Sequence, residues 1–475
     1  MHRGVLIAAG MCALYFAVAA APVLIAGAYD LPRRPFPDDF SSGIAMVGFT
    51  MLLVEFVLSG RFRAFSATMG IDLAMQMHQL LARTALVLLL IHPLLYTLPL
   101  APQRPWDPTL ELTLGLTPAA TITGLIAWGG LAVLVAAGIS RNSFTWRYET
   151  WRFAHGFGAL LVAAAGLHHA LAAGRYSQLP GVLTFWWLAF GVAAASLMLV
   201  YVVRPLLQRR RRYRVKSVMK AASLTWEVEL APDGPARLAY EAGQFAWLKL
   251  GSTRPLFENP FSFSSAPADG ENLRFLIKEA GDLTDGIGRV APGTAAYLDG
   301  PHGHFTLDPP HKGGVVLIAG GIGVAPMLSL LREAAATNDP RPFILVYGNR
   351  VREQMVDVER LAGTTRLRDF RYCPVLAEPP ADWTGARGDL DRGNLGRALP
   401  QTDRAAWVYF ICGPTAMIDS VERTLDELGV PLARIVSEKF QYDFGRGTRR
   451  NRRTVGAWLA ISAALVAAAA LFALR

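Results

Sequence analysis

The chain has 475 residues, of which 52% are hydrophobic, and it carries a formal net charge of +10 at pH 7. This length allows about three domains of roughly 100–200 residues each. Its three cysteines, Cys12, Cys373 and Cys412, exclude a disulfide framework and an iron–sulfur cluster held by four thiolates, so a redox metal here needs other ligands.

The hydrophobic residues gather in seven runs. They cover residues 5–28, 43–58, 71–100, 119–139, 151–173, 181–203 and 455–474. Most exceed the ~18 residues that indicate a membrane-spanning helix, and the second is marginal. The first could be read as a signal peptide, but it is longer than the apolar core of ~7–15 residues typical of one, so we predict a retained helix. Residues 1–207 are therefore predicted to form a six-helix membrane domain, and residues 455–474 an additional C-terminal membrane helix.

Basic residues in the predicted loops indicate the orientation. The side that carries the basic segment 209–214 also carries Arg61, Arg63, Arg141, Arg147 and Arg152. Loops rich in Lys and Arg face the cytoplasm, so the N-terminus and the segment after residue 208 are predicted inside and Arg475 outside. The opposite loops are poorer in basic residues but still contain Arg33, Arg34, Arg104 and Arg175. Basic clusters placed beside apolar runs indicate membrane topology rather than nucleic-acid binding. We predict a multi-pass protein of a bacterial inner membrane.

Histidines lie within two of the runs. His78 and His92, in the third run, are 14 residues apart, which on a helix is ~3.9 turns and ~21 Å of rise on nearly one face. One imidazole then lies near each side of a ~30 Å membrane core. The fifth run has the same direction by topology, so its His155 can face His78, while His168 or His169 faces His92. Two facing pairs suit two haems stacked across the bilayer, and helical phase favours His169.

Zinc is the competing metal. Ligands ~20 Å apart on one helix cannot share an ion, and we expect no Cys or carboxylate near the histidines to complete a tetrahedral set. The sequence therefore favours haem.

Residues 213–312 have short strand-like runs broken by Gly and Pro, which predict a small antiparallel β-barrel. The clearest are Leu224–Leu230, Phe245–Leu250 and Leu273–Lys278. In residues 313–446, strand-like and helical runs alternate, which predicts a parallel sheet covered by helices. These runs are 315–319, 327–336, 343–347, 407–411 and 416–428.

Glycine-rich turns follow two of the predicted parallel strands. Gly320, Gly321 and Gly323 stand between a strand and a helix, where backbone N–H groups can meet a pyrophosphate. The second turn is 412–414, Cys-Gly-Pro, at a strand end where ligands of α/β sheets collect. Arg350 follows the end of the strand 343–347. An acid at such a strand end would favour NAD, whereas an arginine suits the 2′-phosphate of NADPH. The alternative is a solvated arginine on a loop.

Taken together, these motifs resemble the ferric reductase and NADPH oxidase superfamily, in which a haem-binding membrane domain is fused to a ferredoxin-reductase-like FAD and NAD(P) module. The resemblance covers residues from about 40 to 440. It is carried by the paired histidines and by Pro260-Phe-Ser262, the segments 277–284 and 300–303, the Gly-Gly-Ile-Gly turn, and Cys412-Gly-Pro414 with Met417.

The resemblance implies roles for individual residues. Pro260, Phe261 and Ser262 would hold the flavin, with Ser262 near its reactive nitrogen, and Lys278 and Thr284 would contact the cofactor from the segment 277–284. Gly320, Gly321 and Gly323 would receive the nucleotide pyrophosphate, and Gly413 and Pro414 would flank the nicotinamide. Phe440 would cover the flavin. We group Cys412 with Ser262 and Phe440 beside the reacting atoms, although such a cysteine is more often a small buried residue than a nucleophile.

The family's second histidine pair is commonly 13 residues apart, which selects His168 against helical phase; a π-bulge could reconcile the two, and His169 remains the alternate. The chain departs from the family at Asn259, where a basic residue is usual, and in its seventh helix.

The expected activity is electron transfer from cytoplasmic NADPH, or NADH, through FAD and two b haems to an external acceptor. Dioxygen, giving superoxide, is preferred. The alternatives are a ferric chelate, a periplasmic partner or quinone, and a membrane part that is only an anchor. The sequence does not indicate an oligomeric state.

Overall fold

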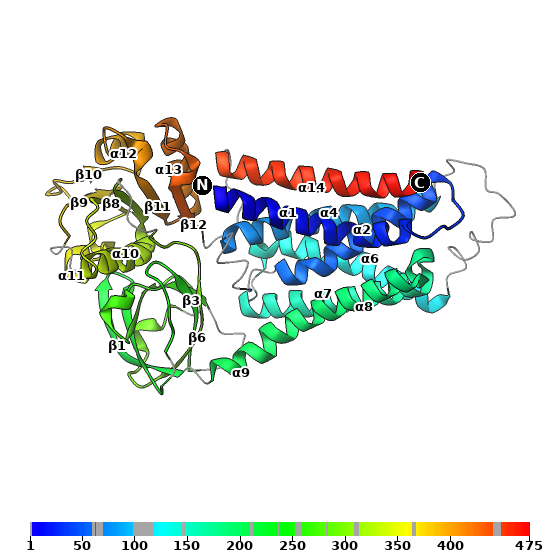
Figure 1. The fold of residues 1–475 in the computed structure, drawn as a ribbon. Coiled ribbons are helices and arrows are strands. Elements are labelled where there is room, and N and C mark those ends of the chain that lie inside the picture. The colour runs from blue at the N-terminus through cyan, green and yellow to red at the C-terminus, as the bar shows by residue number, and fades with distance from the viewer. Residues whose placement is uncertain are drawn as a thin grey trace. The chain divides into compact units, whose positions relative to one another are not determined.

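A computed structural model describes residues 2–58, 62, 70–97, 117–144, 146, 148–209, 212–235, 237–251, 259–281, 284–307, 313–362, 367–439 and 448–475. The chain forms two units. The helical unit comprises Met1–Phe62, Ala74–Val202 and Thr454–Arg475, and the sheet unit comprises Arg63–Leu73 and Val203–Arg453. Figure 1 shows their elements. The four domain boundaries expected from the sequence stay predictions.

Seven helices in the described part of the chain are long and apolar enough to cross a membrane. They are α1 (His2–Gly27), α2 (Phe36–Leu58), α4 (Ile71–Thr97), α6 (Pro118–Ile139), α7 (Tyr148–Ala173), α8 (Pro180–Met198) and α14 (Arg449–Leu474). A π turn, Leu199–Val203, continues α8 into α9 (Arg204–Gln208). α2 begins before its apolar run because Asp38 and Asp39 lie in its first turn, where carboxylates are stabilised by the helix dipole.

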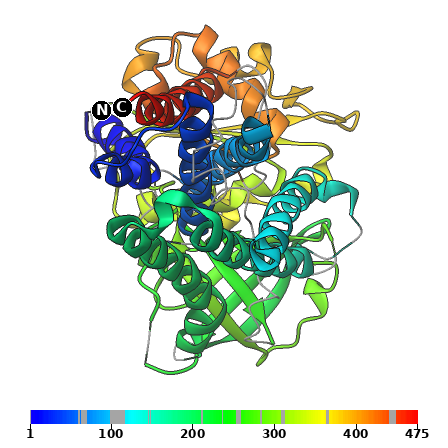
Figure 2. The same cartoon turned by 90° about the vertical axis from the view of Figure 1, so that its right-hand side faces the viewer.

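The seventh helix, α14, packs against the others instead of standing apart. Trp458 Nε1 on α14 donates a hydrogen bond to Thr84 Oγ1 on α4 over 2.8 Å. A Cβ atom added to Gly43 on α2 would lie 3.1 Å from Ala469 Cβ on α14, so these two helices touch backbone to backbone. In Figure 2, α14 lies beside α1 and α2 within the bundle. The predicted fold of six helices plus one C-terminal helix is confirmed.

The first sheet is an antiparallel barrel. Its strands are β1 (Arg212–Ala222), β2 (Thr225–Pro232), β3 (Phe245–Leu250), β4 (Asn259–Ser262), β5 (Leu273–Lys278) and β6 (Ala295–His302), in the order β4-β3-β6-β1-β2-β5. A bridge between Phe263 and Phe275 joins the two edges of the sheet. Both side chains are fully buried in the barrel core.

The second sheet is parallel, with the order β10-β9-β8-β7-β11-β12. Its strands are β7 (Val315–Gly320), β8 (Phe343–Asn349), β9 (Phe370–Leu376), β10 (Ala386–Arg387), β11 (Val408–Cys412) and β12 (Ile435–Glu438). Its helices are α10 (Val324–Ala336), α11 (Val358–Ala362), α12 (Arg392–Ala398) and α13 (Thr415–Glu427). Along β7, Val315 and Leu317 belong to the core under α10, while Val316 and Ile318 belong to the core under α12 and α13. Burial on both faces explains why these strands have unbroken hydrophobic sequences.

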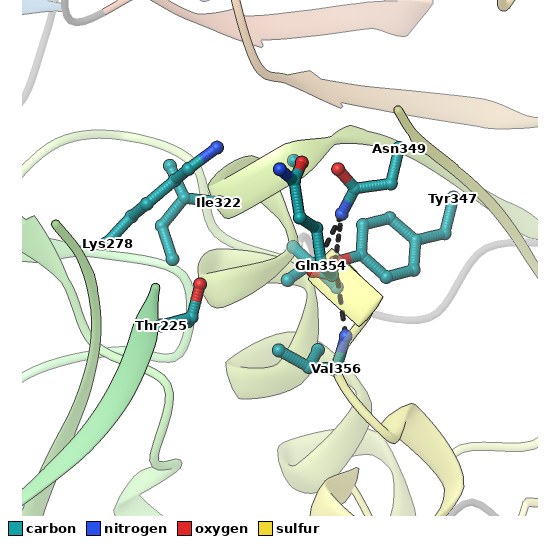
Figure 3. A pocket seen from close by; sticks show the side chains of 9 residues that line it. Thr225, Lys278, Ile322, Tyr347, Asn349, Gln354 and Val356 are labelled. Carbon is teal, nitrogen blue, oxygen red and sulfur yellow. Dashed lines mark hydrogen bonds between the residues drawn. The ribbon is translucent and has the colours of Figure 1, made fainter. Parts of the chain in front are cut away.

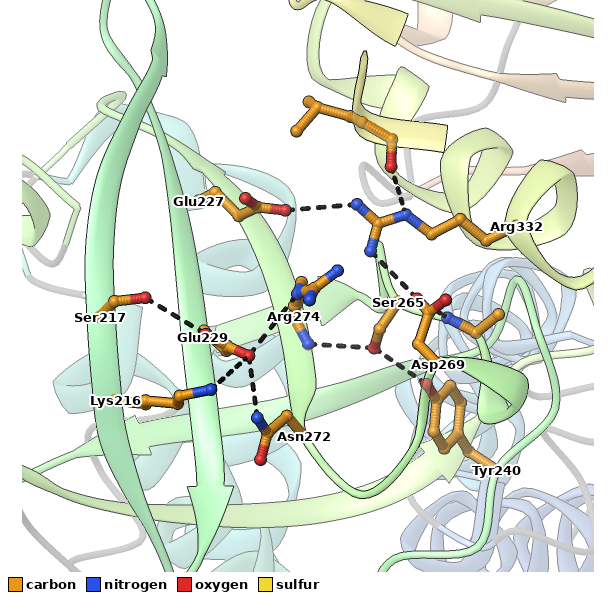
Figure 4. Close-up of polar contacts among 12 residues, drawn as sticks. Lys216, Ser217, Glu227, Glu229, Tyr240, Ser265, Asp269, Asn272, Arg274 and Arg332 are labelled. Carbon is orange, nitrogen blue, oxygen red and sulfur yellow. Dashed lines mark hydrogen bonds and ion pairs between the residues drawn. The ribbon is translucent and has the colours of Figure 1, made fainter. Parts of the chain in front are cut away.

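Arg332 of α10 links the two sheets through a buried guanidinium (Figure 4). Its amino groups lie 3.5 Å from Glu227 Oε1 on β2 and 3.1 Å from Asp269 Oδ2, and its Nε donates to the Leu361 carbonyl over 2.6 Å. One turn earlier, Ser329 Oγ donates to the Ser265 carbonyl over 2.6 Å. A buried arginine needs this many partners, so α10 is held in one position against the barrel.

Candidate functional site

The histidines of the helical unit meet in pairs across α4 and α7. His78 is close enough to His155 for the two imidazoles to interact electrostatically, and His92 is equally within range of His169. Within the described residues, no group of three or more His, Cys, Asp or Glu side chains could hold a metal ion. The structure therefore presents imidazole pairs and not a tetrahedral ligand set.

Three of these imidazoles have their Nδ1 atom next to a protein acceptor. His78 Nδ1 lies 2.7 Å from Glu55 Oε2, His92 Nδ1 lies 2.6 Å from the Leu89 carbonyl, and His169 Nδ1 lies 2.9 Å from the Ala120 carbonyl. Their Nε2 atoms make no hydrogen bond with the residues that the structure describes. Metal-bound histidines usually donate their second N–H to a carboxylate or carbonyl, so this arrangement leaves each Nε2 available to hold a metal cofactor such as haem.

His155 is the exception, because its buried Nδ1 has no hydrogen-bond partner among the described residues. Its ring stacks on Trp151 with the centroids 5.1 Å apart. We expected no carboxylate or Cys near the histidines to complete a tetrahedral set. One carboxylate does reach them, because Glu55, 23 residues before His78, contacts it from α2, but it forms no such set within the described residues. A single glutamate near the end of an apolar run gave no sequence signal for this contact.

The two adjacent histidines of α7 have different surroundings. His168 is exposed and its Nδ1 lies 2.9 Å from Thr123 Oγ1, whereas His169 packs closely on α6. A Cβ atom at Gly124 would lie 2.6 Å from His169 Nδ1, so the glycine makes room for the ring. α7 is α-helical from Tyr148 to Ala173 and contains no π turn to bring His168 into phase with His155.

The residues assigned to the flavin lie on and beside β4. Pro260, Phe261 and Ser262 pair with Trp247, Ala246 and Phe245 of β3, which fixes the direction in which each side chain points. The Thr284 hydroxyl accepts from Ala280 N over 2.9 Å and donates to the Gly281 carbonyl over 3.1 Å. Thr284 thus shapes the turn in which it lies. Phe440 lies outside the described residues.

The glycines after β7 are required by close approach. A Cβ atom at Gly320 would lie 2.3 Å from Met417 Sδ, and one at Gly323 would lie 2.2 Å from the Cys412 carbonyl, while Gly321 has a φ of +54°. Any larger residue would push β7 away from the 412–414 turn. The N-terminus of α10 follows directly. In the sheet, β7 has β8 on one side and β11 on the other, so the strand order reverses at the end of β7. Open α/β sheets bind nucleotides at such a reversal point.

A pocket is lined by residues from both sheets, among them some that the sequence predicted (Figure 3). Lys278 and Thr225 line it from the barrel, and Gly321 and Asn349 line it from the parallel sheet. Asn349 Nδ2 donates to the Gln354 carbonyl over 2.9 Å, which holds the far wall in place. The sequence indicated Lys278 and Gly321 but missed Thr225 and Asn349, whose contributions depend on how the strands pair.

Arg350 is exposed at the end of β8 and does not line this pocket. Its Nε donates to Glu378 Oε1 over 2.8 Å. Sequence reasoning found no acid at this strand end, because Glu378 follows the neighbouring strand β9. An arginine and a carboxylate thus occupy the edge where a nucleotide ribose would lie.

Cys412 and Glu438 are paired neighbours at the ends of β11 and β12. Burial raises the pKa of the Cys412 thiol, so it stays protonated and cannot act as a thiolate nucleophile. Burial also raises the pKa of Glu438 well above its usual range, and its Oε2 has no hydrogen-bond partner among the described residues. A neutral carboxyl and a neutral thiol therefore lie side by side at this edge; Glu438 was missed because its burial depends on the sheet.

Comparisons with known proteins assign both parts of this architecture. Residues 44–166 match the ferric reductase like transmembrane component, and residues 317–423 match the oxidoreductase NAD-binding domain. Ferredoxin–NADP reductase B of Sorangium cellulosum is 32% identical over 217 residues, which are 44% of this chain and 88% of that protein. Through its reductase module the chain belongs to the ferredoxin–NADP reductase family. It is a membrane oxidoreductase that joins a ferric reductase-like helical domain to a ferredoxin-reductase-like module.

Other relatives match the reductase module as well. The reductase component of propane 2-monooxygenase from Rhodococcus jostii is 31% identical over 240 residues, which are 48% of this chain and 63% of the relative, so less than two thirds of that protein is spanned. Among solved structures, an Amycolatopsis cytochrome P450 reductase is 28% identical with a TM-score of 0.43, covering 48% of this chain and 69% of that chain.

Proposed function

We propose that this protein transfers electrons from cytoplasmic NAD(P)H through FAD and two b haems to an acceptor on the opposite side of the membrane. The observation that carries the proposal is the set of half-buried imidazoles on α4 and α7 whose Nδ1 atoms lie next to Glu55, Leu89 and Ala120, in a chain that also matches an NAD-binding domain. An anchor would need none of these contacts.

His78 and His155 would hold the inner haem, and His92 with His169 the outer one. Helical phase, the Ala120 acceptor and the exposure of His168 all favour His169, so His168 becomes the alternate ligand. When bound, FAD supplies the conversion of a hydride into single electrons, and the haems supply one-electron carriers. The imidazoles would hold and orient the haems, and an iron held by two histidines would pass electrons on without binding dioxygen.

On the reductase side, Pro260, Phe261, Ser262 and Thr284 would hold FAD. Gly321, Gly323 and the start of α10 would bind the pyrophosphate, with Lys278 supplying positive charge from the barrel wall of the pocket. Gly413 and Pro414 would flank the nicotinamide. Because Cys412 stays protonated, no negatively charged thiolate would lie beside the nicotinamide and the hydride acceptor.

For the acceptor we propose dioxygen, reduced to superoxide. The predicted outer loop 101–118, of which residues 101–116 lie outside the described part of the chain, contains Arg104, Asp107 and Glu111 but no His or Cys that would bind free metal ions. A docking protein would need roughly 800 Å² on each partner, more than short loops offer. Ferric-chelate reduction is the second candidate, favoured by the family match of residues 44–166.

The haem assignment is tested by spectroscopy of the purified protein. We expect two b haems per chain, and His78→Ala or His155→Ala should each remove the inner one while NADPH-driven dye reduction by the flavin continues. His169→Ala should remove the outer haem and His168→Ala should not. Full haem content in the His78 and His155 variants would refute the ligands, and a protein without a reducible b-type spectrum would be an anchored reductase.

The acceptor is tested by steady-state NADPH oxidation with superoxide detected independently, with and without ferric citrate. Aerobic turnover that yields superoxide is the expected result. Negligible aerobic turnover that rises strongly with the iron chelate under anaerobic conditions would make this protein a ferric reductase.

A further inference from the structure

A buried carboxylate distinguishes His78 from the other histidines. Glu55, on α2, is almost fully buried, and its Oε2 lies 2.7 Å from His78 Nδ1. Its other oxygen, Oε1, accepts a hydrogen bond from Tyr15 OH on α1 over 3.3 Å. Three helices therefore contribute to one hydrogen-bonded chain, Tyr15–Glu55–His78, inside the bundle.

The outer pair has no such carboxylate. Its histidines, His92 and His169, meet backbone carbonyls of Leu89 and Ala120. Glu55 has a neighbouring donor at each oxygen, Tyr15 OH and His78 Nδ1, and hydrogen bonds to the charged form of a carboxyl group favour that form. A hydrogen bond to an ionised acceptor is roughly twice as strong as one between neutral groups. The hydrogen bond from His78 to Glu55 is therefore stronger than the hydrogen bonds that the outer histidines make to backbone carbonyls.

Building on the proposed function, we infer that Glu55 is a positioning residue that holds the inner haem at a lower reduction potential than the outer haem. An imidazole that donates its Nδ1 proton to a carboxylate becomes a more basic ligand at Nε2, and a more basic ligand stabilises ferric over ferrous iron. A buried negative charge acts in the same direction, because the oxidised site carries one more positive charge.

This asymmetry gives the electron a direction. A single electron that enters at the inner site from the flavin side leaves for the outer site, where the histidines have only carbonyl partners. One electron would pass from the haem that His78 and His155 would hold to the haem that His92 and His169 would hold, so that the first is oxidised as the second is reduced, with no bond formed or broken. A lower potential at the inner site makes the outward step downhill and opposes return.

The test is an anaerobic redox titration of both b haems in the purified full-length protein, followed optically and by electron paramagnetic resonance. Glu55→Gln keeps the shape and a neutral acceptor but removes the charge, and should favour reduction of the inner haem about tenfold, a rise of about 59 mV for one electron. Tyr15→Phe removes the donor that competes for Glu55, so the Glu55–His78 bond strengthens and the same potential should fall by a smaller amount. The outer potential should stay constant in both.

Asp39→Asn is the matched control. Asp39 is a buried acid at the opposite end of the same helix. It accepts hydrogen bonds from Tyr176 OH over 2.5 Å and from Arg34 N over 3.3 Å, and it bonds to no histidine in the described part of the chain. It should leave the inner potential unchanged. If Asp39→Asn and Glu55→Gln shift it equally, general electrostatics and not the histidine contact are responsible, and the inference is overturned.

An unchanged inner potential in both Glu55→Gln and Tyr15→Phe would also overturn the inference. If the Glu55→Gln protein does not accumulate, an unchanged inner potential in Tyr15→Phe alone overturns it. A wild-type protein without two b haems would instead refute the proposed function, so the two failures are distinguishable.

Discussion

Arg350 and Glu378 place opposite charges at one edge of the parallel sheet, and the two charges should act in opposite directions on the binding of a 2′-phosphate. Their side chains are exposed and lie 2.8 Å apart, so a 2′-phosphate would have to compete with Glu378 for the guanidinium. We expect NADPH to be preferred over NADH. Arg350→Ala should remove a charge-assisted contact of ~1.5–3 kcal/mol and lower the NADPH-to-NADH ratio of kcat/KM at least about tenfold. Glu378→Gln should raise that ratio.

The control is Arg352→Ala. Arg352 is an exposed neighbour with its own partner, Asp382, at 2.7 Å, and it lies outside the strand end. Its loss should leave the ratio unchanged. An unchanged ratio in Arg350→Ala would remove Arg350 from nucleotide selection.

Glu438 makes the stability of the sheet unit depend on pH. Burial raises its pKa in the folded protein, so above the ordinary glutamate pKa of ~4.3 the unfolded chain releases a proton that the folded one retains. Its contribution to stability therefore falls as pH rises from there through the raised pKa. Glu438→Gln should stabilise the protein at pH 8 and much less at pH 5, measured as the melting temperature of flavin release. A pH-independent difference would contradict this assignment.

At the scale of elements, the contact of α14 with α2 depends on one glycine. Because a Cβ atom at Gly43 would lie 3.1–3.2 Å from Ala469 backbone and side-chain atoms, Gly43→Val must separate the two helices. We expect overpacking of ~1–3 kcal/mol, a lower melting temperature in detergent and some loss of haem. Gly129→Val on α6, with no atom within 4 Å of its Cβ, is the control and should be neutral. Equal behaviour of the two variants would mean that α14 is a loose appendage.

Elements built from local patterns were predictable from the sequence. The bounds of β3 and β5 coincide with those expected, and all seven apolar runs became helices. β1, β6 and β12 were not named in advance, because mixed polar and apolar strands acquire their burial only from their neighbours. At the site, helical spacing predicted the pairing of His78 with His155. The contacts of Glu55, Glu378 and Glu438 could not be predicted in this way, because they join separate elements and periodicity within one element does not encode them.

At the scale of the whole molecule, the seven described helices that are long and apolar enough to cross a membrane would place the two ends of the chain on opposite sides of it. Basic loops predict that Arg475 lies outside. Alkaline phosphatase, which is active only outside the cytoplasm, should be active when fused after Arg475 or after Gln178 and inactive when fused after Ser140. Activity after Ser140 with none after Arg475 would invert the orientation and move the reductase module to the outer side.

Because α9 precedes β1 and α14 follows β12, the reductase module is a loop between two membrane helices and not a head on one stalk. A single proteolytic cut on either side of it would leave the other connection intact, so the module would stay at the membrane at a high local concentration. Shedding a soluble reductase would take two cuts, and a nicked protein would therefore keep both halves of its electron path together in one lipid patch.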